Sequence, residues 1–256
     1  MQYLSYENPY WKLALSPRFI NLPELLHHEG MTASPNRATF SLIDTQQNSL
    51  SRTIDGQVGI NQWQEIETTH SPTPLYMRNQ ENYSLATEGE LLYIQYRSAF
   101  NISGYSLSAF INDIQSAIEN NNIEKIVVDL RFNYGGRIDH FIPVIDYLAS
   151  TTFNQSDKLF VLSGRHTFSS AVGALYSFQN LTNATFAGEP SGGKPNGFSN
   201  VIGFRLTSSN TLFMSTSYLQ VTTEDTDAFY PQHLTPFTQQ DFLTGNDPAL
   251  ALILSE

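Results

Sequence analysis

Two hydrophobic periods alternate along the second half of the chain. Short apolar runs predict strands at Leu91–Arg97, Lys125–Arg131, Leu159–Leu162 and Ala184–Ala187, and the continuous run at Lys125–Arg131 is typical of a strand buried on both faces. Between these runs, apolar residues recur at helical spacing over 107–118, over 138–149 and from Ser169 onward, with Ser106 as a candidate helix cap. Strand, helix and strand in this order predict an α/β core.

Residues 1–85 show a different pattern, in which Pro, Asn, Ser and Thr interrupt short apolar groups. Residues 38–44 and the turn at Asp55-Gly56 favour strands over helices. We therefore predict an N-terminal β-rich appendage over 1–85 and an α/β core over 86–256.

The last part of the core has weaker signals. Leu212–Tyr218 alternates between apolar and polar residues as a strand does, and residues 224–236 resemble an irregular acidic loop. Asp247-Pro248 then starts a short helix over 249–254. No internal repeat and no low-complexity run is present.

The charge balance and the cysteine count exclude several classes of function. The formal net charge is -11 and no basic cluster occurs, so we expect neither a nucleic acid nor an anionic membrane surface as partner. Without cysteine there is no disulfide, thiolate nucleophile or cysteine zinc site. The pair His27-His28 lacks a third ligand at usable spacing, so no metal is predicted.

Membrane and export signals are weak in this sequence. No apolar segment approaches the roughly 18 residues that span a bilayer, and the first residues lack the pattern of a signal peptide. Whether the chain derives from a longer exported precursor stays open.

Chemistry-bearing residues follow three of the predicted strands. In open α/β sheets ligands bind outside the carboxyl ends of the strands, and these ends carry 133–136, 166–170 and 188–197. Gly135 and Gly136 let backbone N–H groups approach a substrate closely, which makes them candidate oxyanion donors. A glycine turn that only reverses the chain is the alternative.

A serine and a lysine in the other two loops permit nucleophilic acyl transfer. Ser169 opens a predicted helix, where unpaired backbone N–H groups can hold an oxyanion, and Lys194 is the single cation of its loop. A neutral lysine amine can take the proton of a serine hydroxyl. Activity through such a base is expected to rise with pH.

The segments VVDLRFNYGG, GRHTFSSA and AGEPSGGKPN, in this order, resemble the core of the C-terminal processing peptidases, or tail-specific proteases. The first segment matches the family's D-L-R-x-N-x-G-G block. Lys194 follows Ser169 by 25 positions, which fits the family's Ser-Lys dyad and selects Ser169 over Ser170.

This resemblance covers about residues 75–256 and implies a crotonase/Clp-protease-like β/α spiral core. It implies a serine endopeptidase that hydrolyses peptides or unfolded protein segments through an acyl-enzyme, with Ser169 as nucleophile and Lys194 as base. It also implies backbone oxyanion donors at Gly135 and Ser170, no cofactor, and a periplasmic or secreted location, although a cytoplasmic one stays open.

The sequence departs from the family at three places. Ser191 replaces a threonine, and Phe198 stands where a glutamine is often found, so Asn196 becomes the candidate for orienting Lys194. His166 is a candidate pocket residue. No PDZ module is recognisable in 1–85, which can be the remnant of a longer N-terminal region.

Other interpretations fit parts of the sequence. Ser191 to Lys194 formally matches S-x-x-K, although two glycines oppose the helix that this motif needs. A Ser-His-Asp triad could use His140 or His166 with Asp139. A binding module is the alternative from another class, because the retinoid-carrying interphotoreceptor proteins share the implied fold and hold apolar ligands.

Overall fold

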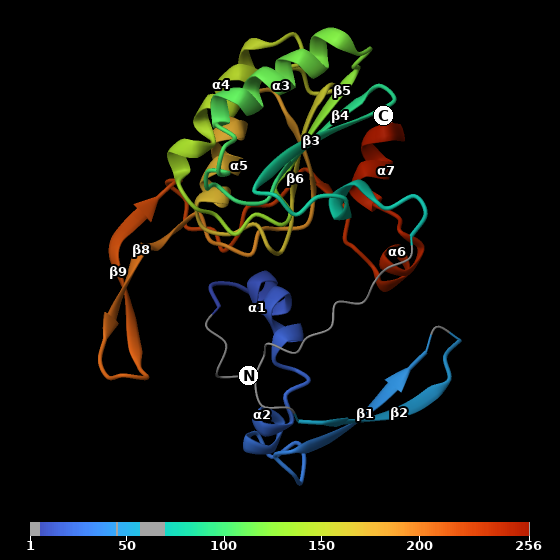
Figure 1. Ribbon diagram of the computed structural model, residues 1–256, viewed down its shortest axis with the longest axis vertical. Helices are drawn as coiled ribbons and strands as arrows, with labels where there is room; N and C mark the ends of the chain where they lie inside the picture. Colours follow the sequence, from blue (N-terminus) through green and yellow to red (C-terminus); the bar gives the residue numbers. More distant parts are fainter. Residues whose placement is uncertain (1–5, 45, 57–69, 256) are drawn as a thin grey trace. The chain divides into compact units, whose positions relative to one another are not determined.

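The computed structural model describes residues 6–44, 46–56 and 70–255. Its contacts divide the chain into two units, one formed by 1–5 with 12–69 and the other by 6–11 with 70–256. The larger unit contains the segments discussed above for the α/β core, together with a short N-terminal piece, 6–11, which residues 12–69 separate from them along the sequence. Figure 1 shows the elements along the chain.

A six-stranded sheet forms the centre of the larger unit, in the order β10-β7-β6-β5-β4-β3. Strands β4 to β7 and β10 are parallel, and β3 is antiparallel to β4 at one edge. Their bounds are Tyr83–Glu88 (β3), Leu91–Tyr96 (β4), Lys125–Asp129 (β5), Leu159–Ser163 (β6), Thr185–Gly188 (β7) and His233–Leu234 (β10). The α/β class is therefore confirmed, whereas the crotonase-like spiral stays a prediction.

Helices cover both faces of this sheet, as Figure 1 shows. One face packs against α3 (Leu107–Asn120), α4 (Ile142–Ser150) and α5 (Ser170–Leu181), and the other against α7 (Pro248–Ser255) and the short η3 (Leu75–Met77). Successive strand residues alternate between the two cores: Leu92 and Ile94 face the larger one, and Leu91 and Tyr93 the smaller one. Burial on both faces explains the continuous apolar runs.

The predicted helix boundaries are largely confirmed. Ser106 caps α3, since its side chain accepts the backbone N–H of Ala109 at 3.1 Å. Pro143 lies in the first turn of α4, where its missing N–H costs no hydrogen bond, after a 3-10 turn at Ile138–His140. No helix in the described part of the chain is long and apolar enough to cross a bilayer.

A buried ion cluster ties the end of β5 to the start of α7. Arg131 bonds Asp129 at 2.9 Å and Asp247 at 2.7 Å, and all three side chains are buried. Tyr93 adds hydrogen bonds to both Asp129 and Arg131. Asp129 and Arg131 thus form a buried structural ion pair in the segment that precedes Gly135.

The smaller unit contains a hairpin, β1 (Arg37–Ile43) paired antiparallel with β2 (Ser49–Asp55), in the region that was predicted to be β-rich. It also contains α2 (Pro23–His28), a 3-10 turn at Ser16–Arg18 and most of α1 (Pro9–Leu15). These helices were not predicted, because each is too short to show a hydrophobic period. His27 and His28 end α2, and no cluster of three metal-ligating side chains occurs among the described residues.

Two further elements lie beyond β7. A long hairpin, β8 (Asn196–Arg205) with β9 (Thr211–Gln220), forms a separate two-stranded sheet. It projects from the rest of the larger unit and is drawn in orange in Figure 1. A short helix, α6 (Gln239–Thr244), precedes α7.

Candidate active site

Ser169 occupies a strained turn between β6 and α5. It is the N-cap of α5 and has φ 54° and ψ -129°, backbone angles that residues other than glycine rarely adopt. Such a conformation costs on the order of 1–3 kcal/mol and is concentrated at functional sites. The side chain of Ser169 is exposed and caps nothing, whereas Ser170 is buried. Of the two adjacent serines, Ser169 alone is open to a substrate.

The three predicted loops meet around Ser169. A Cβ added to Gly135 would lie 2.8 Å from the Cβ of Ser169, and one added to Gly193 would lie 3.0 Å from the Ser169 nitrogen. The lysine loop is fastened to the serine loop by Thr167, whose carbonyl accepts the N–H groups of Gly192 and Gly193 at 3.0 and 3.1 Å. The glycines therefore serve close backbone approach on both sides of the serine.

The candidate oxyanion donors differ in their present partners. The N–H of Gly135 donates to the side chain of Asn133 at 2.8 Å. Neither Gly136 nor Ser170 donates a backbone hydrogen bond to any residue that the structure describes. A Cβ on Gly135 would lie 3.1 Å from the Ser170 nitrogen, so the missing side chain leaves room beside that donor.

Lys194 approaches the site from its loop but points its amine elsewhere. Its Nζ lies 3.5 Å from a carboxylate oxygen of Asp225, and no hydrogen bond joins it to Ser169 in the described structure. The side chain is 30% exposed. The structure thus brings the two loops together without forming a hydrogen-bonded dyad.

Two polar side chains of the lysine loop have structural partners. Ser191 donates to the carbonyl of Gly193 at 2.8 Å and accepts the N–H of Phe229 at 2.9 Å, so its buried hydroxyl is committed. Asn196 bonds the backbone of residues 221, 222 and 224 through both ends of its amide. Asn196 therefore fixes the backbone that follows Lys194. In the described structure no hydrogen bond joins the side chains of Asn196 and Lys194.

The N-terminal piece 6–11 supplies contacts that sequence reasoning missed. Asn8 is 2% exposed and donates to the carbonyls of Ser191 and Asp227 at 3.0 and 2.7 Å. Glu7 accepts the backbone N–H of Lys194 at 2.9 Å, and its burial raises the pKa of the Glu7 carboxyl, against the lowering effect of Lys194. No local signal marks these residues, because their partners lie more than 180 positions away.

Aromatic rings line the loops next to Ser169. Trp11 stacks on Phe168 with ring centroids 4.2 Å apart, and it also meets Tyr134 and His166 edge-on. His166 accepts or donates a hydrogen bond with the hydroxyl of Tyr134 at 2.9 Å. His166, a candidate pocket residue, therefore lies in this aromatic cluster, and its role in the site stays a prediction.

The alternative triad of Ser169 with His140 and Asp139 is not assembled among the described residues. His140 is buried, with Asn101 on one ring nitrogen at 2.9 Å and Tyr96 on the other, and burial lowers its pKa. Asp139 is exposed and pairs with Arg137 at 2.6 Å. Neither side chain has a contact with Ser169 among the described residues.

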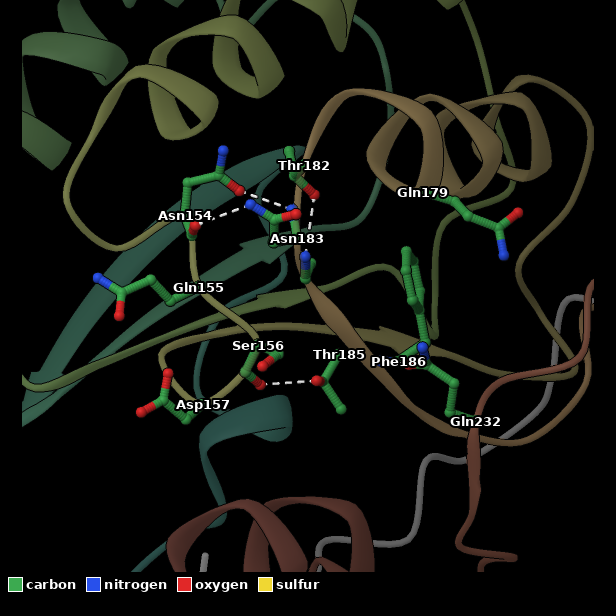
Figure 2. Close-up of a pocket in the computed structure, with 11 residues that line it drawn as sticks. Asn154, Gln155, Ser156, Asp157, Gln179, Thr182, Asn183, Thr185, Phe186 and Gln232 are labelled. Atoms are coloured by element: carbon green, nitrogen blue, oxygen red, sulfur yellow. Dashed lines mark hydrogen bonds between the residues drawn. The ribbon is translucent and has the colours of Figure 1, made fainter.

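A polar hollow of about 580 Å³ lies at the opposite end of β6 and β7, near the residues where these strands begin. Figure 2 shows that its polar groups bond one another: Asn154 accepts the N–H of Asn183 at 2.6 Å, and Thr185 donates to the carbonyl of Ser156 at 2.6 Å. These bonds join the segments at the amino ends of the strands, away from the loops around Ser169.

No family model matches the sequence, and no curated protein matches it either. Solved structures do match. Mature CPAF aligns with a TM-score of 0.52 and 11% identity over 85% of this chain and 65% of that one, and a mutant of CPAF with 0.53 and 12% over 86% and 68%.

The photosystem II D1 C-terminal processing protease also aligns, with a TM-score of 0.47 and 13% identity over 83% of this chain and 60% of that one. The chain has the fold of the tail-specific proteases. It spans less than two thirds of the length of the D1 processing protease and of mature CPAF. At these identities the tail-specific protease likeness concerns the fold, and the chemistry must be argued from the site.

Proposed function

We propose that the chain is a serine endopeptidase that cleaves peptides or unfolded protein segments. The observation that carries this proposal is the exposed, strained Ser169 at the start of α5, with glycines of two other loops packed against it. A capping serine has no need of a positive φ, whereas a nucleophile held clear of its helix gains an open approach to a carbonyl carbon.

In the proposed reaction, the Oγ of Ser169 attacks the peptide carbonyl and its proton passes to the neutral amine of Lys194. Backbone N–H groups of Ser170 and Gly136 stabilise the oxyanion, and Gly135 joins them if its N–H leaves Asn133. Lys194 then protonates the leaving amine, and the acyl-enzyme is hydrolysed by water. Because Nζ now faces Asp225, the dyad forms only after this side chain turns towards Ser169.

The supporting residues differ from those that the sequence suggested. Asn196 supports the loop backbone, and Glu7 and Asn8 hold the same loop from the N-terminal piece. We propose peptides and unfolded segments as substrates because Ser169 is exposed and the oxyanion donors beside it are backbone N–H groups. Such a site can accept an extended peptide. We place the protein outside the cytoplasm on the family resemblance alone.

Cleavage of a diverse peptide mixture, followed by mass spectrometry, tests this function. We expect new fragments from the wild-type protein and from Ser170→Ala, and none from Ser169→Ala or Lys194→Ala. Fragments that persist in Ser169→Ala would move the nucleophile elsewhere. No cleavage by the wild type would favour the second candidate function, a binding module of the same fold. This candidate is supported by the Lys194 amine, which pairs with Asp225 and forms no hydrogen bond with Ser169 in the described structure.

A further inference from the structure

The β8–β9 hairpin has two chemically different faces. Residues directly opposite each other on paired strands share a face. Three of the opposite pairs on one side are entirely apolar, and we call them the apolar face: Phe198 with Tyr218, Ile202 with Met214, and Phe204 with Leu212. Asn200 and Thr216 lie between the first two of these pairs, and Asn200 donates a hydrogen bond to the Thr216 hydroxyl at 2.6 Å. On the other side each pair includes a small or polar residue: Gly197 with Leu219, Ser199 with Ser217, Val201 with Ser215, Gly203 with Phe213, and Arg205 with Thr211.

The apolar face is uncovered in the described structure. Phe198 is 76% exposed, Tyr218 58% and Met214 50%, although the rings of Phe198 and Tyr218 contact each other edge-on at 5.3 Å. An isolated two-stranded hairpin is marginally stable in water, and soluble proteins seldom expose several large apolar side chains together without a use for them. A six-residue apolar face therefore indicates an occupant.

We propose that the apolar face of the β8–β9 hairpin binds an extended, apolar segment of the substrate chain, remote from the scissile bond. This inference rests on the proposed function. The hairpin continues directly from the loop of Lys194, with Phe198 four residues and Phe204 ten residues farther on. At about 3.3 Å per residue, an extended substrate would meet the face roughly four to ten residues from the cleaved bond.

The charge of the hairpin selects an uncharged segment. Residues 196–220 contain Arg205 and no acidic residue, in a chain with a formal net charge of -11. An acidic or basic segment would find no ionic partner on this surface, whereas Leu, Phe, Met or Val side chains would remove apolar area from water. Unfolded chains expose such residues, and folded proteins bury them.

A second copy of the chain fits the face less well. Ten residues by two strands give a footprint of roughly 300 Å², below the roughly 800 Å² that each partner contributes to a standard protein interface. Two copies would also bring net charges of -11 together. A peptide of a few residues can bind through a small contact area, and an uncharged peptide is not repelled by the net negative charge of the chain.

Peptides with one cleavable core and a ten-residue flank test the proposal. The flank is either rich in Leu and Phe or made of Ser and Gly, and is placed on either side of the core. We expect the apolar flank on one side to lower KM about tenfold for the wild type, without a change in kcat. Phe198→Ser/Phe204→Ser should abolish this advantage and leave cleavage of the bare core unchanged.

The matched control is Val201→Ser/Phe213→Ser, which removes exposed apolar groups from the opposite face. It should keep the tenfold advantage. Equal loss in both double variants, or equal KM for the two flanks in the wild type, would overturn the proposal. So would sedimentation that shows a wild-type dimer and a monomeric Phe198→Ser/Phe204→Ser variant with unchanged KM.

A binding measurement separates failure of this proposal from failure of the proposed function. Fluorescence anisotropy of the labelled apolar-flank peptide with Ser169→Ala protein needs no cleavage. Binding that is about tenfold tighter than for the Ser-Gly flank, and lost with the apolar-face variant, supports the docking surface even if no peptide is cut. Absence of that difference rejects the surface whatever the activity.

Discussion

Glu7 and Lys194 are joined by a hydrogen bond across 187 positions of sequence, from the backbone N–H of the lysine to a carboxylate oxygen at 2.9 Å. The bond ties the N-terminal piece 6–11 to the loop that carries the proposed base. Asn8 reinforces it through Ser191. The position of Lys194 therefore depends on a segment that lies outside the region of family resemblance.

Loss of this bond should reduce catalysis more than binding. We expect Glu7→Ala to lower kcat about fivefold with little change in KM, because one hydrogen bond of about 1 kcal/mol no longer fixes the lysine loop. Glu7→Gln should keep most of the activity, since its amide oxygen can still accept. Steady-state kinetics on a short peptide measure both, with Glu24→Ala as control. Equal losses in the Ala and Gln variants would assign the effect to the charge instead.

Gly135 should tolerate no side chain. A Cβ there would lie 2.8 Å from the Cβ of Ser169, so we expect Gly135→Ala to lose at least about 100-fold in kcat/KM. Gly104→Ala is the matched control, because Gly104 also has a positive φ (75°) but no atom within 4 Å of an added Cβ. It should cost roughly 1 kcal/mol of stability and leave activity intact. Full activity of Gly135→Ala would contradict the proposed site.

Asp225 should restrain the base. Its ion pair with Lys194 at 3.5 Å must break before the amine can reach Ser169, and Asp225 is largely exposed, so the pair is weak. Asp225→Ala should therefore raise the initial rate up to about fivefold at neutral pH. Asp157→Ala makes the same change of net charge at the opposite end of the strands and should have no effect. A fall in rate with Asp225→Ala would make Asp225 a positioning residue.

The buried ion cluster should make stability depend on pH. Burial alone would raise the pKa of Asp247, but the charge and hydrogen bonds of Arg131 outweigh it and hold this pKa below its usual range. The unfolded carboxyl titrates near about 3.9, so the stabilisation is present above roughly pH 4 and is lost as pH falls through the lower native pKa.

Asp247→Asn tests this dependence. We expect a loss of about 3 kcal/mol in the free energy of unfolding at pH 7, because Arg131 loses one of two buried partners, and a smaller difference from wild type at pH 3. Urea unfolding at both pH values measures it. Asp139→Asn, in the exposed pair with Arg137, should change little. A difference that is constant with pH would show that the carboxylate charge plays no part.

Local patterns predicted the core because each of them reports burial. The apolar runs of β4 to β7 require cover on both faces, and the spacing of Leu107, Phe110, Ile111 and Ile114 requires a helix with one buried face. The order of these elements then limits the topology to a parallel sheet with its loops at one edge. Three of those loops do meet at Ser169.

The sequence by itself determined the strands β4 to β7, the helices α3, α4, α5 and α7, the edge of the sheet where chemistry could occur, and the choice of Ser169 and Lys194 as candidates. Tertiary structure alone decided that Ser169 is exposed and strained while Ser191 is committed to Gly193 and Phe229, and that Glu7, Asn8 and Trp11 hold the site. The physical reason is range. Hydrophobic periodicity indicates which residues of a single helix or strand are buried. Hydrogen bonds between residues about 180 positions apart depend instead on how the whole chain packs.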